Sequence, residues 1–154
     1  MNMERVRVQS AAFDMGAELN HFAAQAPSVG AIVSFSGMTR DVAANNLSAM
    51  VIEHYPGMTE TALSTIRAQA MERFGLLDAM ILHRYGKFAP GDPIMMVATA
   101  ARHRAAAFDG AEFLMDYLKS RAPFWKQEIT PEGAVWVTAK GKDEAALHRW
   151  QSDP

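Results

Sequence analysis

Two lysines in the last third of the chain, Lys119 and Lys126, have types and spacing that could do chemistry. Lys119 falls in the last turn of an expected helix, and Lys126 lies in an expected strand that begins after Pro123. A lysine in a desolvated cleft near other cations has a lowered pKa and can act as a nucleophile or a proton carrier. The alternative is a surface ion pair between Lys126 and Glu128, worth about 0.2–1 kcal/mol.

Side chains alternate along this expected strand, so Lys126 and Glu128 share one face. The other face carries Trp125, Gln127 and Ile129. If Trp125 and Ile129 pack inward, the two charged residues face the opposite side together. Glu128 could then orient Lys126 or keep it charged.

Two further basic clusters could bind an anion. Arg40 lies in a polar loop just after Gly37, and a glycine permits close approach of a ligand. Arg102, His103 and Arg104 precede an expected long helix, whose free N–H groups and partial positive charge suit a phosphate. The alternatives are a solvated loop arginine in the first case, and water-facing arginines beside a turn histidine in the second.

Hydrophobic spacing and turn residues predict alternating helices and strands, which is typical of an α+β or α/β protein. Helices are expected over Phe13–Ala26, Thr59–Phe74, Ala105–Arg121 and Asp143–Trp150. Strands are expected over Ala31–Ser36, Ala49–His54, Ala79–Arg84, Ile94–Thr99, Phe124–Ile129 and Ala134–Thr138. These elements must position the basic clusters.

Two of the expected helices have a clear apolar face at helical spacing. In the helix that begins at Thr59, its expected N-cap, this face holds Leu63, Ile66, Ala70 and Phe74. In the helix that follows Arg104, the face holds Phe108, Ala111, Met115 and Leu118.

Length and composition limit the classes of function. The 154 residues favour one domain over 1–154, and a net charge of -2 gives no overall attraction to nucleic acid or an anionic membrane. The N-terminal segment lacks the pattern of a secretory signal and no apolar run is long enough to span a bilayer, so we expect a cytoplasmic protein. The chain has no cysteine and no metal-binding motif, so any sulfur it handles must arrive on another molecule.

Taken together in order, the clusters resemble the large, catalytic subunits of molybdopterin synthase, the MoaE family. The similarity runs from about residue 30 to residue 136, and no single piece is as specific as the ordered set. The matching segments are Phe35-Ser36-Gly37-Met38-Thr39-Arg40-Asp41, Glu53-His54-Tyr55-Pro56-Gly57-Met58, His83-Arg84-Tyr85-Gly86, Pro90-Gly91-Asp92, His103-Arg104-Ala105 with Phe108, and Met115 to Glu128.

The resemblance implies an α+β fold of the hammerhead type and a homodimer. It also implies a small ubiquitin-like sulfur-carrier subunit at each end of the dimer, which makes a heterotetramer. The Gly-Gly tail of that partner would bring sulfur as a thiocarboxylate. The substrate would be cyclic pyranopterin monophosphate (precursor Z), and two sulfur transfers would build the dithiolene of molybdopterin. No cofactor and no metal would be needed in this subunit.

The family's site residues carry over onto matching positions. Lys119 would meet the partner's tail carboxyl as proton carrier or electrostatic stabiliser, and Lys126 would assist at the pterin. The positions that match substrate-holding residues are Met38, Thr39, Arg40, His103 and Arg104, with Gln127 and Glu128 completing the pocket wall. Two departures are Met38, where many relatives carry a basic residue, and the segment 42–46, which lacks a glycine often found there.

Two other classes of protein remain as alternatives. The first is a non-catalytic binding module that holds a partner's tail or an anionic ligand in the same basic cleft. The second is a nucleotide-binding protein, against which the sequence offers no phosphate-binding loop.

Overall fold

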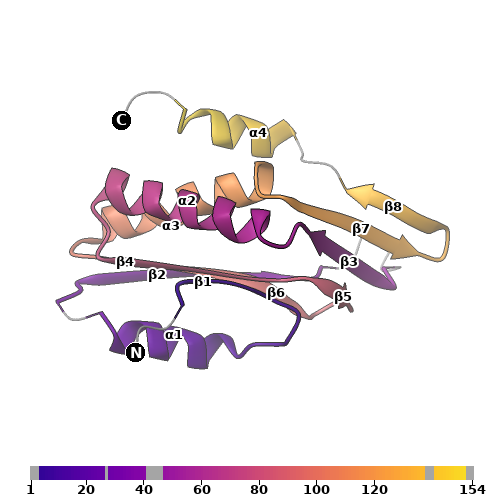
Figure 1. Ribbon diagram of the computed structural model, residues 1–154, viewed down its shortest axis with the longest axis horizontal. Helices are drawn as coiled ribbons and strands as arrows, with labels where there is room; N and C mark the ends of the chain where they lie inside the picture. Colours follow the sequence, from indigo (N-terminus) through magenta and orange to yellow (C-terminus); the bar gives the residue numbers. More distant parts are fainter. Residues whose placement is uncertain (1–3, 27, 41–46, 138–140, 152–154) are drawn as a thin grey trace.

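The computed structural model describes residues 4–26, 28–40, 47–137 and 141–151. Within these residues the chain forms two four-stranded sheets and four helices, arranged in layers (Figure 1). The α+β class predicted from the sequence is confirmed. None of the helices in the described ranges is long and apolar enough to cross a membrane.

The first sheet, sheet A, is the structural centre of the molecule. Its strand order is β1 (Val6–Gln9), β4 (Asp78–Arg84), β6 (Pro93–Ala101), β2 (Ala31–Met38). β1 runs parallel to β4 and the other pairs are antiparallel, so the sheet is mixed. All of β6 except its first residue is buried, as expected for an apolar strand covered on both faces.

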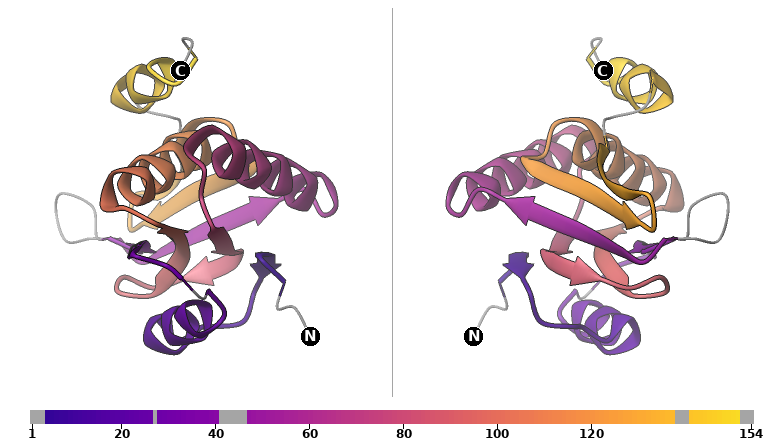
Figure 2. Two further views of the ribbon diagram at one scale, coloured as in Figure 1. Left: turned by 90° about the vertical axis from the view of Figure 1, so that its left-hand side faces the viewer. Right: turned by 90° about the vertical axis from the view of Figure 1, so that its right-hand side faces the viewer.

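Helices cover both faces of sheet A (Figure 2). On one face α1 (Met15–Ala24) packs Phe22 against alternate residues of β4, among them Met80 and Leu82. On the other face α2 (Met58–Phe74) and α3 (Arg104–Ser120) pack against the intervening residues, such as Ile81. Because side chains alternate along β4, its residues contribute in turn to two separate cores, one on each face of sheet A.

The second sheet, sheet B, extends beyond the helices at one end of the molecule (Figure 1). It is antiparallel, in the order β5 (Gly86–Phe88), β3 (Ala49–His54), β7 (Phe124–Thr130), β8 (Gly133–Val137). The last helix, α4 (Gly141–His148), packs on α3 on the side away from sheet A (Figure 2).

Four features differ from the sequence expectations. β1 and β5 were not predicted, because four and three residues are too few to show a clear period. Thr59 is not an N-cap: it is buried in the first turn of α2, where its hydroxyl donates to the Tyr55 carbonyl at 2.8 Å. Phe108 is not in the apolar face of α3, since it is 59% exposed.

Exposed Phe108 lies beside a part of α3 that approaches its neighbours closely. The buried residues of α3 are small in its first half, at Ala107, Gly110 and Ala111, and large further along, at Phe113 and Leu114. A Cβ at Gly110 would come within 2.8 Å of the Leu76 side chain. A larger side chain therefore has no room at Gly110, and Phe108 lies outside the buried face.

The start of β2 depends on a second close approach, at Gly30. Its N–H donates to the Ala101 carbonyl at 3.0 Å, and a Cβ on Gly30 would lie 2.0 Å from the Arg102 carbonyl oxygen. We expect Gly30→Ala to lower the free energy of unfolding by about 2 kcal/mol, because the backbone must move apart. Urea denaturation measures this change.

The matched control is Gly16→Ala in the first turn of α1. There a Cβ would meet only the Asp14 carboxylate, at an ordinary 3.4 Å, and alanine favours helix over glycine. This variant should be as stable as the wild type or slightly more stable. Equal stability of the two variants would show that the Gly30 contact is not tight.

Candidate active site

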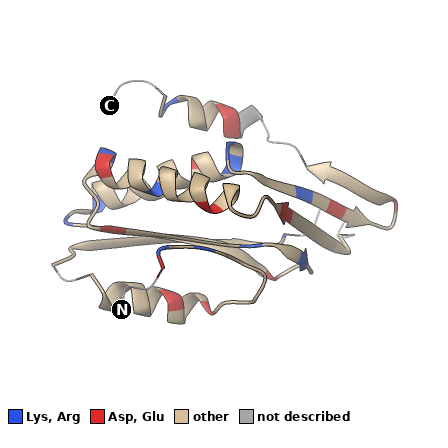
Figure 3. Cartoon of the chain, in the orientation of Figure 1, with Lys and Arg blue, Asp and Glu red and all other residues tan. Residues whose placement is uncertain are grey.

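The structure brings Lys119 and Lys126 together at one corner of the molecule. Lys119 lies in the last turn of α3, and Lys126 lies in β7, which begins four residues after α3 ends. Figure 3 shows basic residues at the end of α3 and on the neighbouring part of β7. The carbonyl end of a helix favours a cation such as Lys119.

The pKa of Lys126 is lowered from 10.5 to about 8, chiefly by burial and then by the positive charge of Lys119. Asp143, on α4, opposes this shift. A pKa near 8 means that Lys126 is mostly charged at neutral pH but releases its proton easily. Such a group can stabilise negative charge and can also carry a proton.

Beneath the lysines lies a group of aromatic rings. His83 of β4 stacks on Phe124 of β7, with ring centres 3.8 Å apart and planes 18° from parallel. His54 lies 6.2 Å from Phe124 and 4.4 Å from Tyr85, and its Nδ1 is 3.1 Å from the Thr59 hydroxyl. The sequence did not single out either histidine as functional.

His83 is almost completely buried, with 4% of its surface exposed. Burial lowers the pKa of His83 to about 3, and the charges of Lys126, Lys119 and His54 act in the same direction. The available signal in the sequence was that His83 interrupts the apolar run of β4 one residue before the strand ends.

The face of β7 that packs inward is the opposite of the one considered from the sequence. Trp125 is 44% exposed and touches exposed Tyr55 edge to face, whereas Phe124 packs on His83. Lys126 shares the inner face with Phe124, which explains its desolvation. Among the ion pairs of the described residues none joins Lys126 to Glu128, so the surface-pair alternative is wrong.

Gln127 and Glu128 occupy different faces of β7. Glu128 lies on the face of Lys126, two residues further along, and is partly buried. Gln127 lies on the other face with Trp125, because strand side chains alternate. Of these two residues, Glu128 lies on the same face of the strand as Lys126 and Gln127 does not.

Arg40 lies at the same end of sheet A as the lysine pair. Gly37 of β2 pairs with Met95 of β6, and Met95 pairs with His83 of β4. Arg40 follows Gly37 by three residues and is exposed. It is therefore free to reach an anion near this end.

The two residues before Arg40 have different environments. Met38 is 44% exposed. Thr39 is buried, and its backbone N–H donates to the Asp92 carbonyl while its own carbonyl accepts from the Gly91 N–H, both at 2.8 Å. Thr39 thus anchors the loop that carries Arg40. The glycine-poor segment 42–46 lies outside the described residues.

Arg102, His103 and Arg104 lie at the opposite end of the same helix. All three are exposed, His103 is the N-cap of α3, and the first turn of α3 contains no acidic residue. A helix rises about 1.5 Å per residue, so about 22 Å of α3 separate Arg104 from Lys119. One chain cannot place this cluster and the lysine pair in one pocket.

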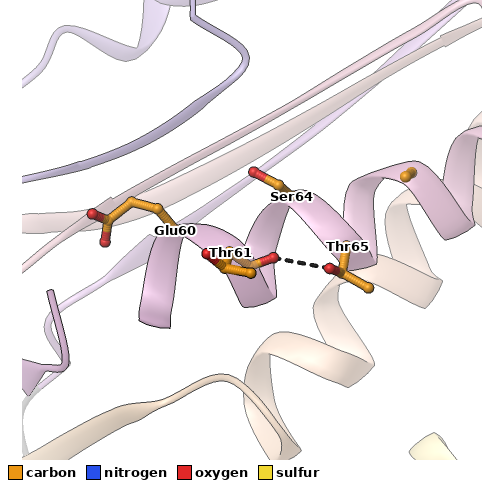
Figure 4. A pocket seen from close by; sticks show the side chains of 5 residues that line it. Glu60, Thr61, Ser64 and Thr65 are labelled. Atoms are coloured by element: carbon orange, nitrogen blue, oxygen red, sulfur yellow. Dashed lines mark hydrogen bonds between the residues drawn. The ribbon is translucent and has the colours of Figure 1, made fainter. Parts of the chain in front are cut away.

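A surface hollow elsewhere on the molecule does not coincide with the lysine pair. A shallow hollow on α2 is lined by Glu60, Thr61, Ser64, Thr65 and Ala68 (Figure 4). Its Thr65 hydroxyl is already bonded to the Thr61 carbonyl at 3.0 Å. Across the described ranges there is also no group of three or more His, Cys, Asp or Glu side chains that could hold a metal ion.

Fold and site define an α+β protein with a cationic, partly desolvated corner suited to anionic groups. The chain belongs to the MoaE family: the family model described as "MoaE protein" matches residues 8–121.

Relatives over nearly the whole length carry one name. A "Molybdopterin synthase catalytic subunit" of Cereibacter sphaeroides is 60% identical over 146 residues, which are 95% of this chain and 99% of that one. The solved "Molybdopterin biosynthesis MoaE protein" from Burkholderia ambifaria has a TM-score of 0.83 and 48% identity, and the match covers 98% of this chain and all of that one. A protein-protein complex of subunits 1 and 2 of molybdopterin-converting factor from Helicobacter pylori contains a chain of this fold, at TM-score 0.75 and 18% identity over 87% of this chain and 90% of that one.

The family predicted from the sequence is thus confirmed. The family match begins at residue 8, earlier than the start near residue 30 expected from the motifs. The first part of the chain supplies β1, the edge strand of sheet A, and α1, which covers one face of that sheet. Its contribution is structural, which is why it carries no motif of chemical residues.

Removing the charge of Lys126 should stabilise the fold. The folded-state pKa of Lys126 is lowered from 10.5 to about 8, so its charged form destabilises the fold fully below pH 8. We expect Lys126→Met to raise the free energy of unfolding at pH 7 by about 1 kcal/mol, a value reduced for partial exposure. The advantage should shrink between pH 8 and pH 10.5, as the wild-type lysine loses its proton.

Urea denaturation at a series of pH values measures the effect. Lys87→Met provides the control, since Lys87 is an exposed lysine of β5 and its replacement should change stability by less than about 0.5 kcal/mol. A Lys126→Met protein that is less stable than the wild type at pH 7 would contradict the desolvated position of this lysine.

Proposed function

We propose that this chain is the catalytic subunit of a molybdopterin synthase, a sulfurtransferase. It takes sulfur from the thiocarboxylated C-terminus of a small ubiquitin-like subunit and passes it to cyclic pyranopterin monophosphate. Two transfers form the dithiolene of molybdopterin. The observation that carries the proposal is the pairing of Lys119 with a Lys126 whose pKa is about 8, in a chain whose nearly full-length relatives are named catalytic subunits.

The charges of the reactants explain why two lysines are useful. A thiocarboxylate, a cyclic phosphate and the oxyanion that develops during acyl chemistry are all negative, and fixed cations in a partly dry site stabilise them. Lys119 meets the tail carboxyl of the partner, while Lys126 acts at the pterin and exchanges protons near neutral pH. The chain contains no cysteine, so the sulfur comes from the partner and no bound cofactor is required.

Substrate binding uses the remaining cations. Arg40 lies at the lysine end of sheet A, and Met38 and Thr39 shape the start of its loop. The cluster Arg102–Arg104 supplies positive charge at the other end of α3. Because these two ends are about 22 Å apart, a second copy of the chain is needed to complete each pocket.

A homodimer with two-fold symmetry satisfies this requirement. In such a dimer each chain can offer its helix start, with His103 and Arg104, to the lysine pair of the other chain. Each half of the dimer also has to bind one small subunit, which gives a heterotetramer. Sheet B exposes large apolar residues, including Trp125, Val135 and Trp136, and exposed apolar patches of this kind mark protein interfaces. We place the assembly in the cytoplasm.

Single-turnover conversion of cyclic pyranopterin monophosphate tests the function. The purified chain is given a thiocarboxylated small subunit, and dithiolene product is measured for wild type, Lys119→Ala, Lys126→Ala and the exposed-site control Lys87→Ala. We expect each active-site variant to lose at least about 100-fold in rate, with binding of the small subunit largely kept. The control should match the wild type.

The alternative of a non-catalytic binding module makes the opposite prediction. In that case wild type forms no product although the small subunit binds, and Lys119→Ala weakens binding alone. That result would rule out the enzyme.

Mixing two inactive variants tests the shared pocket. Lys119→Ala and Arg104→Ala chains are each inactive as homodimers if both residues serve every pocket. When the two are unfolded together and refolded, half of the dimers are mixed and one of their two pockets is intact. We expect about a quarter of the wild-type rate to return. No recovery, with mixed dimers verified by mass spectrometry, would mean that Lys119 and Arg104 act in the same chain or in separate processes.

A further inference from the structure

We infer that His83 is a positioning residue: its neutral ring holds Phe124, and through Phe124 the start of β7, so that Lys126 stays desolvated beside Lys119. The importance of this for sulfur transfer rests on the proposed function. The positioning itself is a property of the chain alone and can be measured without substrate.

The stack between His83 and Phe124 joins the two sheets. β4, which carries His83, pairs with β1 and β6 in sheet A, and β7, which carries Phe124, pairs with β3 and β8 in sheet B. No strand ladder connects β4 to β7. The ring contact at 3.8 Å and 18° therefore helps to fix the position of β7 relative to sheet A at this corner, together with the apolar packing of Phe124.

The orientation of the His83 ring is itself fixed. Its Nδ1 lies 2.8 Å from the Arg84 carbonyl oxygen, and a carbonyl only accepts, so Nδ1 carries the proton and donates. The ring is 4% exposed, and its neighbours across the strand ladders, Val8 on β1 and Met95 on β6, are apolar. The imidazole thus presents a flat, fixed surface to Phe124.

The neutrality of His83 matters because cations surround it. Burial lowers its pKa to about 3, so it does not add a third positive charge to the lysine pair at neutral pH. A phenylalanine would also be neutral and flat but would lack the hydrogen bond that fixes the ring. The titratable or charged groups around this corner are Lys119 on α3, Lys126 and Glu128 on β7, His54 on β3, Tyr85 after β4, and Asp143 on α4.

Lys126 depends on Phe124 through the geometry of β7. The two residues are two positions apart on one face of the strand, and they pair with His54 and Ile52 of β3. If Phe124 loses its support, the start of β7 can move outward and Lys126 gains water. Both the loss of burial and a greater distance from Lys119 raise the pKa of Lys126.

The test is the pH dependence of acylation of Lys126 by acetic anhydride, followed by peptide mass spectrometry on the free chain. Two variants separate the ring from its chemistry: His83→Phe keeps a flat ring, and His83→Leu keeps a similar volume without one. In the wild type, acylation of Lys126 should reach half of its maximal rate near pH 8. His83→Phe should stay within about 0.3 pH unit of it, and His83→Leu should shift it upward by about one unit.

Phe124→Leu removes the same stack from the other strand and gives a second measurement. It should raise the pH of half-maximal acylation of Lys126 by the same amount as His83→Leu. The double variant should raise it no further, because both changes remove the same interaction. Thermal unfolding confirms that each variant is folded. If His83→Leu does not fold, Phe124→Leu alone decides the question.

Two outcomes overturn the inference. An unshifted Lys126 titration in folded His83→Leu or Phe124→Leu would show that the stack does not position the lysine. A shift in His83→Phe as large as that in His83→Leu would show that the stacking of a flat ring on Phe124 is not what holds Lys126 in place. Neither outcome depends on whether the chain makes molybdopterin, so failure of the proposed function would be seen separately, in the single-turnover assay.

Discussion

Two ammonium groups held near each other repel, and one of them, that of Lys126, also lies partly away from water, so the rest of this structure has to support that arrangement. Lys119 lies at the carbonyl end of α3, where the helix dipole favours a cation. The negative charge of Asp143 on α4 offsets only part of the effect of burial and of Lys119 on Lys126, so the pKa of Lys126 remains low. The fold thus supplies enough stabilisation to hold Lys126 in an unfavourable place, as is common where chemistry is done.

The two sheets have different tasks in meeting this constraint. Sheet A and the helices that enclose it contain most of the buried apolar residues, so this part of the molecule provides stability. Sheet B is more exposed and carries Lys126, the lysine proposed to act at the pterin, together with exposed apolar residues. The two parts meet at the corner where α3 and β4 end and β7 begins. There the enclosed sheet A and its helices position Lys119 and Lys126.

Much of this could be predicted from the sequence because the signals were local. Leu63, Ile66 and Ala70 are buried on α2 as their spacing indicates, and β3 has the predicted bounds. Phe108 could not be placed correctly, because its exposure depends on how closely α3 approaches Leu76, which is a tertiary property. Similarly, the inner face of β7 was decided by His83, a residue about 40 positions earlier whose contact with Phe124 no local pattern reveals.

The buried imidazole also sets a limit on the acidity that the chain tolerates. The pKa of His83 falls from an ordinary 6.5 to about 3 on folding. Between these two pH values His83 is protonated in the unfolded chain and neutral in the folded chain. The contribution of neutral His83 to the free energy of unfolding is therefore fully present above pH 6.5 and declines as the pH falls toward 3. To take up a proton His83 would have to leave its stack with Phe124, so the cost of acid falls on the ring contact that joins the two sheets.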